Sequence, residues 1–124
     1  MQVTRPALPL GGAPPLVVDR TRDLTIEWDG SPSDVQVLVD VQLDAIEGEP
    51  RRALRCRYDT ALGAARVPSS ALSRLSPAGP GFLGVDVVSE RVVSVAGWGQ
   101  VRIELMSSGL WVTGNRFVTS IEVR

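Results

Sequence analysis

Apolar and polar residues alternate along most of this chain. In residues 23–28 every second position is apolar, ending at Trp28, and the Asp29-Gly30-Ser31-Pro32 turn follows. Residues 34–43 repeat the alternation for ten positions. A period of two is typical of strands with one buried face. With the short Gly/Pro turn between them, the two stretches predict a β-hairpin.

The same pattern continues through the rest of the chain. Strands are predicted at residues 16–19, 23–28, 34–43, 52–59, 64–67, 82–88, 91–96, 100–106 and 116–123. Residues 69–75 have the only helical pattern, with serine available as N-cap and Pro77 after it. The expected fold is all-β, an antiparallel β-sandwich of about seven to nine strands with one short helical crossover near 69–75; a closed barrel is the alternative.

The alternation also predicts a single domain and its core. Residues 1–15 are rich in Pro and Gly and are expected to form an extended N-terminal segment, whereas residues 16–124 form the sandwich. The predicted core consists of Leu24, Ile26, Trp28, Val35, Val37, Val39, Val41, Leu54, Cys56, Tyr58, Val85, Val87, Val101, Ile103 and Leu105.

Composition argues against several functions. The net charge is -1, and no residue is lysine or histidine, so no global charge favours nucleic acid or an anionic membrane. Without histidine there is no Ser-His-Asp or Cys-His arrangement and no common zinc site, and the lone Cys56 is expected to be a buried apolar residue. We therefore expect no enzyme activity, no catalytic residue and no cofactor.

A glycine motif and an acidic cluster are the two candidate ligand sites. The stretch Gly79-Pro80-Gly81-Phe82-Leu83-Gly84 matches G-x-G-x-x-G, but a strand follows it where a dinucleotide fold requires a helix. Four carboxylates near the end of the 34–43 strand are weak candidates for calcium: Asp40, Asp44, Glu47 and Glu49. The favoured alternative is a cross-strand charge ladder with the arginines of the next strand, Arg51, Arg52, Arg55 and Arg57, which also form a candidate anion patch.

Two tryptophans suggest carbohydrate binding as an alternative function. Trp98 lies between two glycines, and Trp111 follows Gly109 and Leu110, so both are expected in loops. Exposed indole rings stack on sugars, whereas rings that close the end of a sandwich are packing residues. A polysaccharide is therefore the alternative ligand.

The last predicted strand suggests self-association. Its apolar positions near the C-terminus are candidate interface residues: Phe117, Val118, Ile121 and Val123. An exposed terminal strand can pair with the edge of a neighbouring chain. Expected partners are thus other proteins or further copies of this chain.

Several stretches resemble known β-sandwich families. Residues 23–28, followed by the turn and Val35-Gln36-Val37-Leu38-Val39, resemble the opening strands of fibronectin type III and immunoglobulin-like domains. A wider likeness, over about residues 16–107, is to an uncharacterised β-sandwich domain of exported and lipid-anchored proteins in deltaproteobacteria, especially myxobacteria. The stretches that carry it are Asp19-Arg20-Thr21-Arg22-Asp23-Leu24, Leu54-Arg55-Cys56, Val67-Pro68-Ser69-Ser70-Ala71-Leu72 and Ala96-Gly97-Trp98.

The resemblance implies a non-enzymatic role in the cell envelope or outside the cell, as a structural or adhesive module of a surface protein or lipoprotein. It supplies no functional residues to transfer. The first six residues contain no apolar signal-peptide core, and no run of 18 apolar residues predicts a direct membrane span.

Overall fold

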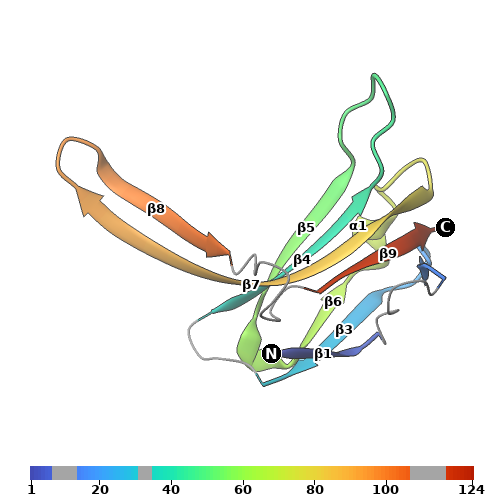
Figure 1. Cartoon of the computed structure of the whole chain (residues 1–124), viewed down its shortest axis with the longest axis horizontal. Coiled ribbons are helices and arrows are strands. Elements are labelled where there is room, and N and C mark those ends of the chain that lie inside the picture. The colour runs from blue at the N-terminus through green and yellow to red at the C-terminus, as the bar shows by residue number, and fades with distance from the viewer. Residues whose placement is uncertain (7–13, 31–34, 107–116) are drawn as a thin grey trace.

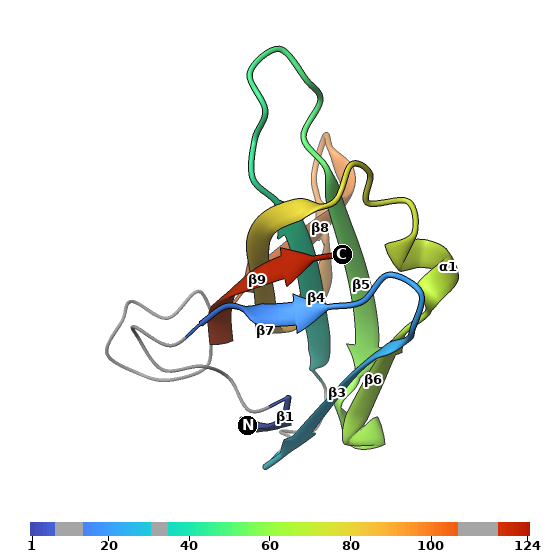
Figure 2. The same ribbon diagram turned by 90° about the vertical axis from the view of Figure 1, so that its right-hand side faces the viewer.

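The protein is an all-β sandwich of two sheets. The computed structural model describes residues 1–6, 14–30, 35–106 and 117–124. Three strands form the smaller sheet and six form the larger one, and the two sheets pack against each other. Figure 2 shows the sheets as two layers, with β3 and β6 in one and β4 and β5 in the other. The predicted fold class is confirmed.

The smaller sheet has the order β1-β3-β6 and is antiparallel. It consists of β1 (Gln2–Arg5), β3 (Leu24–Asp29) and β6 (Ala64–Val67). Strand β1 was not predicted from the sequence, because its four residues precede the Pro/Gly-rich stretch and only Val3 is apolar at its centre. This strand occupies one edge of the small sheet.

The larger sheet has the order β2-β9-β7-β4-β5, with β8 paired to β7. Its strands are β2 (Leu16–Val18), β4 (Gln36–Leu43), β5 (Ala53–Asp59), β7 (Gly79–Val95), β8 (Gly99–Met106) and β9 (Phe117–Val123). All pairs are antiparallel except β2 with β9. The predicted strands 82–88 and 91–96 are wrong as two elements, because Ser89-Glu90 contains neither glycine nor proline and β7 runs through it without a break.

The helical segment is shorter than predicted. The α-helix α1 spans Ser69–Leu72, and a single 3-10 turn, η1 (Thr60–Leu62), precedes β6. The Asp23 carboxylate, directly before β3, caps the start of α1. It accepts a hydrogen bond from the Ser69 N–H at 2.7 Å and another from Arg66. Leu72 is buried, so this short helix closes one side of the core.

The core lies between the two sheets. The predicted core residues that are buried are Ile26, Trp28, Val37, Val39, Val41, Val85 and Val87. Those that are partly buried and pack against the core are Leu24, Leu54, Cys56 and Tyr58. Inside the core, the Trp28 indole N–H donates a hydrogen bond to the Thr60 carbonyl at 3.0 Å, which satisfies the one polar group of the ring.

Two predicted core residues are exposed. Ile103 and Leu105, on β8, are 41% and 58% exposed, and Val101 is half-buried. The prediction of Ile103 and Leu105 as core residues is wrong, because β8 extends beyond the small sheet. In Figure 1 the far half of β7 and the whole of β8 project from the sandwich as a separate hairpin. We call this hairpin, residues 89–105, the β-arm.

Candidate functional site

The β-arm begins where β7 loses its neighbours in the sandwich. Pairing of β7 with β9 ends at Val85, and pairing with β4 ends at Val88. From Val88 to Val95 the pairing partner is β8. Because Val88 is opposite both Gln36 of β4 and Met106 of β8, these two strands lie on opposite sides of β7. Among the described strands, none pairs with the outer edge of β8.

One face of the β-arm is mostly apolar. Cross-strand partners in a sheet share a face, and the register pairs Ser89 with Leu105, Arg91 with Ile103, and Val93 with Val101. Positions 89, 91, 93 and 95 continue the face on which Leu83, Val85 and Val87 point into the core. The apolar face of the arm is therefore the inner face of the sandwich, extended beyond the covering sheet.

This face is open to solvent in the described structure. Val93 and Val95 are exposed together with Ile103 and Leu105, and they form one patch along both strands. Contiguous exposed apolar patches of this kind mark interaction surfaces in soluble proteins. Arg91, also exposed, is the one charged residue on this face. The patch can bind an apolar or partly apolar surface.

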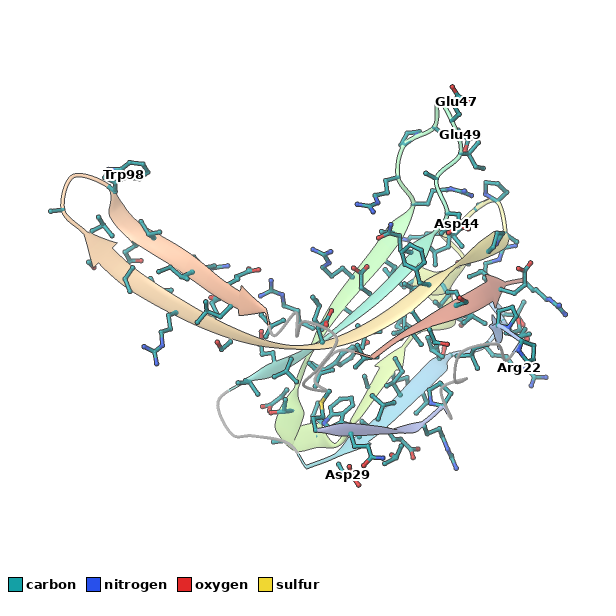
Figure 3. All side chains as sticks on the ribbon, viewed as in Figure 1. Arg22, Asp29, Asp44, Glu47, Glu49 and Trp98 are labelled. Atoms are coloured by element: carbon teal, nitrogen blue, oxygen red, sulfur yellow. The ribbon has the colours of Figure 1, made fainter. Side chains whose placement is uncertain are left out.

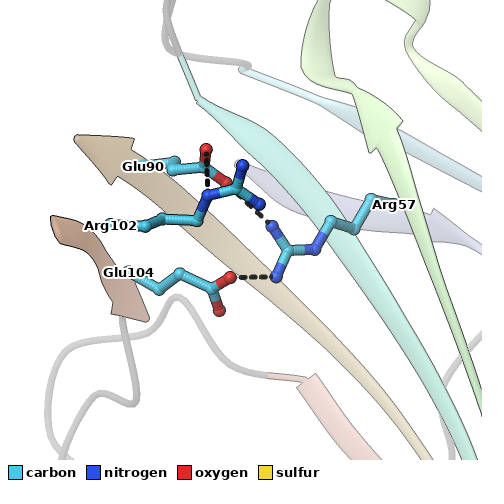
Figure 4. Close-up of polar contacts among 4 residues, drawn as sticks. All are labelled: Arg57, Glu90, Arg102 and Glu104. Carbon is cyan, nitrogen blue, oxygen red and sulfur yellow. Dashed lines mark hydrogen bonds and ion pairs between the residues drawn. The ribbon is translucent and has the colours of Figure 1, made fainter. Parts of the chain in front are cut away.

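The opposite face of the arm carries three charged residues, Glu90, Arg102 and Glu104, beside the exposed Val92. Arg57 of β5 ties this face to the sandwich. The Arg57 guanidinium lies 2.7 Å from Glu104 Oε1 and 3.3 Å from Glu90 Oε2, and Arg102 Nε lies 3.2 Å from Glu90 Oε1 (Figure 4). Glu104, and then Glu90, raise the pKa of Arg57 above its usual value. The network spans β5, β7 and β8 and therefore links the arm to the sandwich.

The tip of the arm presents a tryptophan. The backbone N–H of Trp98 donates a hydrogen bond to the Val95 carbonyl at 3.0 Å. Gly97 and Gly99 on either side have φ values of 81° and 77°, which suit glycine in this turn. Trp98 is 82% exposed and points outward from the turn (Figure 3). The predicted loop position of Trp98 is confirmed. Trp111 lies outside the described residues.

The four candidate calcium ligands are not brought together. Asp40 lies within β4, where its Oδ2 accepts a hydrogen bond from Arg55 at 3.0 Å. Asp44 follows β4 directly, and Glu47 and Glu49 are exposed near the tip of the β4–β5 loop (Figure 3). Within the described ranges, no group of three or more Asp, Glu, His or Cys side chains is placed to hold a metal ion.

The arginines of the β5 region have separate partners. Arg55 pairs with Asp40 across the strands, as the charge-ladder interpretation predicts. Arg52 donates to the backbone carbonyls of Asp44 and Pro77, and Arg57 contacts the arm. These side chains therefore join structural elements at three different places.

The glycine-rich motif is part of strand β7. A Cβ atom at Gly81 would lie 2.1 Å from the Gln42 carbonyl oxygen, so only glycine lets β7 approach β4 at this point. A Cβ atom at Gly84 would have ordinary contacts, the nearest at 3.8 Å from Asp40. The motif begins a strand and does not precede a helix, which agrees with the structural interpretation.

The C-terminal strand is not the exposed edge that was expected. β9 lies between β7 and β2, and Ile121 and Val123 are 1% and 0% exposed in the core. Their candidacy as interface residues is wrong because β2 pairs with Ile121–Val123 and the small sheet covers their inner face. The side chains of Phe117 and Val118 lie outside the described part of the structure.

Sequence reasoning missed the β-arm, although one signal was present. Residues 82–95 contain no proline, no asparagine and no two adjacent turn residues, and this run is longer than the five or six residues of a common sandwich strand. A strand of that length must extend beyond a domain of this size. The length of the run without a turn signal marks the arm.

Comparisons with known proteins do not assign the chain to a family. No family model matches the sequence, and neither the curated proteins nor the solved structures contain a match. No helix in the described part of the chain has the length and apolar character needed to cross a membrane.

Proposed function

We propose that this chain is a non-enzymatic protein-interaction module, a structural or adhesive β-sandwich of a bacterial surface or exported protein, and that the β-arm is its docking element. The observation that carries the proposal is the contrast in exposure along one face of β7. Leu83, Val85 and Val87 are buried, whereas Val93 and Val95 on the same face are exposed.

The physical cost of the arm supports a docking role. Isolated two-stranded hairpins are marginally stable in water, and their edges leave backbone N–H and C=O groups unpaired. A partner that covers the apolar face removes apolar surface from water, and each Å² removed stabilises the complex by about 25 cal/mol. A partner that packs on the arm therefore gains from groups that the sandwich leaves open.

The proposed location rests on the resemblance to exported and lipid-anchored bacterial domains. The stretch Ala96-Gly97-Trp98, one of those that carry the resemblance, is the tip of the arm. Fractionation of cells that produce the natural protein tests this part of the proposal. Recovery in the envelope or medium supports it, and recovery with the cytoplasmic proteins contradicts it.

Site-specific photocrosslinking in those cells tests the docking role. Benzoylphenylalanine is placed at position 98 on the arm or, as a matched control, at position 62, where Leu62 is 66% exposed on the sandwich. We expect a discrete protein adduct from position 98 and none from position 62. Adducts of equal yield from both positions, or none from position 98, contradict the proposal.

A second candidate function is carbohydrate binding, favoured by the exposure of Trp98. Indole faces stack on sugar rings, and a ring at the end of an arm is accessible from several sides. On a glycan array, Trp98→Ala should abolish binding while Trp98→Phe keeps part of it. Equal signals from both variants and the wild type contradict this function.

A further inference from the structure

The outer edge of β8 is open in the described structure. Its residues 102–105 are exposed, and in the described structure β8 pairs only with β7. In Figure 1 the hairpin projects away from the two packed sheets, and its base stays linked to β5 through Arg57. An open strand of eight residues is a template for adding another strand.

We propose that the partner of this edge is a second copy of the chain. The β8 strands of two copies pair antiparallel across a two-fold axis that passes between the two Ile103 residues. This inference rests on the proposed docking function and names its partner. The sequence of β8 identifies the partner. When two β8 strands run antiparallel, the residues of one are complementary to those of the other.

The complementarity is specific to one register. With Ile103 opposite Ile103 of the second copy, Val101 faces Leu105 and Leu105 faces Val101 on the apolar side. On the other side Arg102 faces Glu104, and Glu104 faces Arg102. Opposite-charge and aliphatic cross-strand pairs both stabilise antiparallel sheets. The five residues Val-Arg-Ile-Glu-Leu therefore form five favourable pairs.

Neighbouring registers are disfavoured by charge. Antiparallel partners must lie on the same face, so the register can slip only in steps that keep odd positions opposite odd positions. The two nearest alternative registers are centred on residue 102 and on residue 104. The first places Arg102 opposite Arg102 of the other copy, and the second places Glu104 opposite Glu104. Like charges directly opposite each other are destabilising. The charges thus select the register centred on Ile103.

The charged side chains are accessible for these contacts. The Arg102 side chain is 66% exposed and that of Glu104 is 38% exposed. A carboxylate accepts several hydrogen bonds, so Glu104 can receive Arg102 of the second copy while it keeps its contact with Arg57. The networks of the two copies would then join across the axis.

The pairing also doubles the apolar face. Two arms joined edge to edge give a four-stranded sheet in the order β7-β8-β8-β7, on which both apolar patches lie on the same side. The net charge of each chain is only -1, so no strong overall repulsion opposes the association. A closed two-fold contact uses the edge of β8 once in each copy.

Charge reversal in separate chains tests the register. Arg102→Glu places carboxylates opposite Glu104, and Glu104→Arg places guanidinium groups opposite Arg102. We expect each variant alone to dimerise at least about tenfold more weakly than the wild type in light scattering. An equimolar mixture of the two variants should dimerise again, because every cross-strand charge pair is then complementary. A mixture no stronger than the single variants overturns the proposal.

Disulfide trapping tests the axis. In a Cys56→Ala background, Ile103→Cys places two thiols on adjacent strands at a cross-strand distance close to that of a disulfide. We expect mild oxidation to yield a covalent dimer from Ile103→Cys. Val101→Cys and Leu105→Cys should each yield little alone and a mixed dimer together. A common melting temperature in the reduced state confirms that all variants fold.

The outcomes separate this inference from the proposed function. A wild-type mass of 13.3 kDa at every concentration, with no disulfide at position 103, overturns self-pairing. The docking function then still stands if the photocrosslinked adduct at position 98 contains a different protein, and fails if no adduct forms. Dimers that neither charge reversal weakens also overturn the inference, because their contact lies elsewhere.

Discussion

The two halves of β7 share one face of the sheet and have opposite environments along it. In the first half, Leu83 and Val85 belong to the core between the sheets, and Val87 on the same face is buried. In the second half, Val93 and Val95 continue the same face and are exposed. The sequence changes only briefly where the environment does, because Ser89 and Arg91 interrupt the apolar positions of this face before Val93 and Val95 resume them. Alternation reports which face a residue occupies, and the length of the opposing sheet decides whether that face is covered.

The lengths of the strands explain where the small sheet stops covering β7. β7 has 17 residues, whereas β1, β3 and β6 have 4, 6 and 4. At about 3.3 Å per residue, β7 is more than twice as long as any strand that can cover it. The excess is the β-arm.

Matched leucine truncations give the largest expected difference between the two regions. Leu83 and Leu105 lie on the same face of one sheet and are 1% and 58% exposed. Leu83→Ala should lower the free energy of unfolding by about 2–5 kcal/mol, since it leaves a cavity in the core. Leu105→Ala should lower it by less than about 1 kcal/mol, measured by urea denaturation of dilute protein. Equal losses would show that the arm packs against the sandwich.

Matched glycine substitutions probe the sandwich half of β7. Gly81→Ala should destabilise the fold by at least about 1–3 kcal/mol, because its Cβ meets the backbone of Gln42. Gly84→Ala, on the same strand, has room for a Cβ and should change the unfolding free energy by less than about 1 kcal/mol. Thermal denaturation of both variants checks the pair. A tolerated alanine at position 81 contradicts the close approach of β7 to β4.

Two arginines of β5 separate the anchoring of the arm from the stability of the sandwich. Arg57 contacts Glu90 and Glu104 of the arm, whereas Arg55 contacts Asp40 of β4. Arg57→Ala should increase amide exchange in β8 several-fold, because the arm loses its tie to β5. Arg55→Ala should leave exchange in β8 unchanged. The same exchange pattern in both variants would mean that Arg57 does not hold the arm.

The smallest expected effect is the pH dependence due to Asp23, which lies far from the arm. The hydrogen bond from the Ser69 N–H, and then Arg66, lower the pKa of Asp23 below 3.8. Its stabilising contribution is therefore complete above pH 3.8 and is lost as the pH falls through the lower pKa of the folded state. Asp23→Asn should weaken the acid sensitivity of unfolding without changing amide exchange in the arm. An unchanged pH profile contradicts this assignment.

The sequence was sufficient to predict the fold class and most strands. Period-two alternation located β3, β4 and β5 to within one or two residues, because each has one face in the core. It also placed Ile26, Trp28 and Val39 inside. These predictions succeed where the inner face is covered along the whole strand.

The candidate site was not predictable in the same way. Ile103 and Leu105 have the alternation of core residues, and only the three-dimensional extent of the small sheet exposes them. Likewise, β9 ends the chain in sequence but lies between β2 and β7, because position along a chain does not fix position in a sheet. Trp98 was found because glycines flank it in the turn.

Hydrogen exchange along β7 and β8 at increasing protein concentration tests the central claim most directly. In dilute protein, amides of β7 within residues 81–88 should exchange slowly and those of the β-arm rapidly, since only the first group belongs to the packed sandwich. As the concentration rises, protection should spread through β8 while residues 81–88 stay as they were. An arm that is already as protected as the core in the dilute monomer, or that gains no protection at high concentration, contradicts a free docking arm that pairs with its own copy.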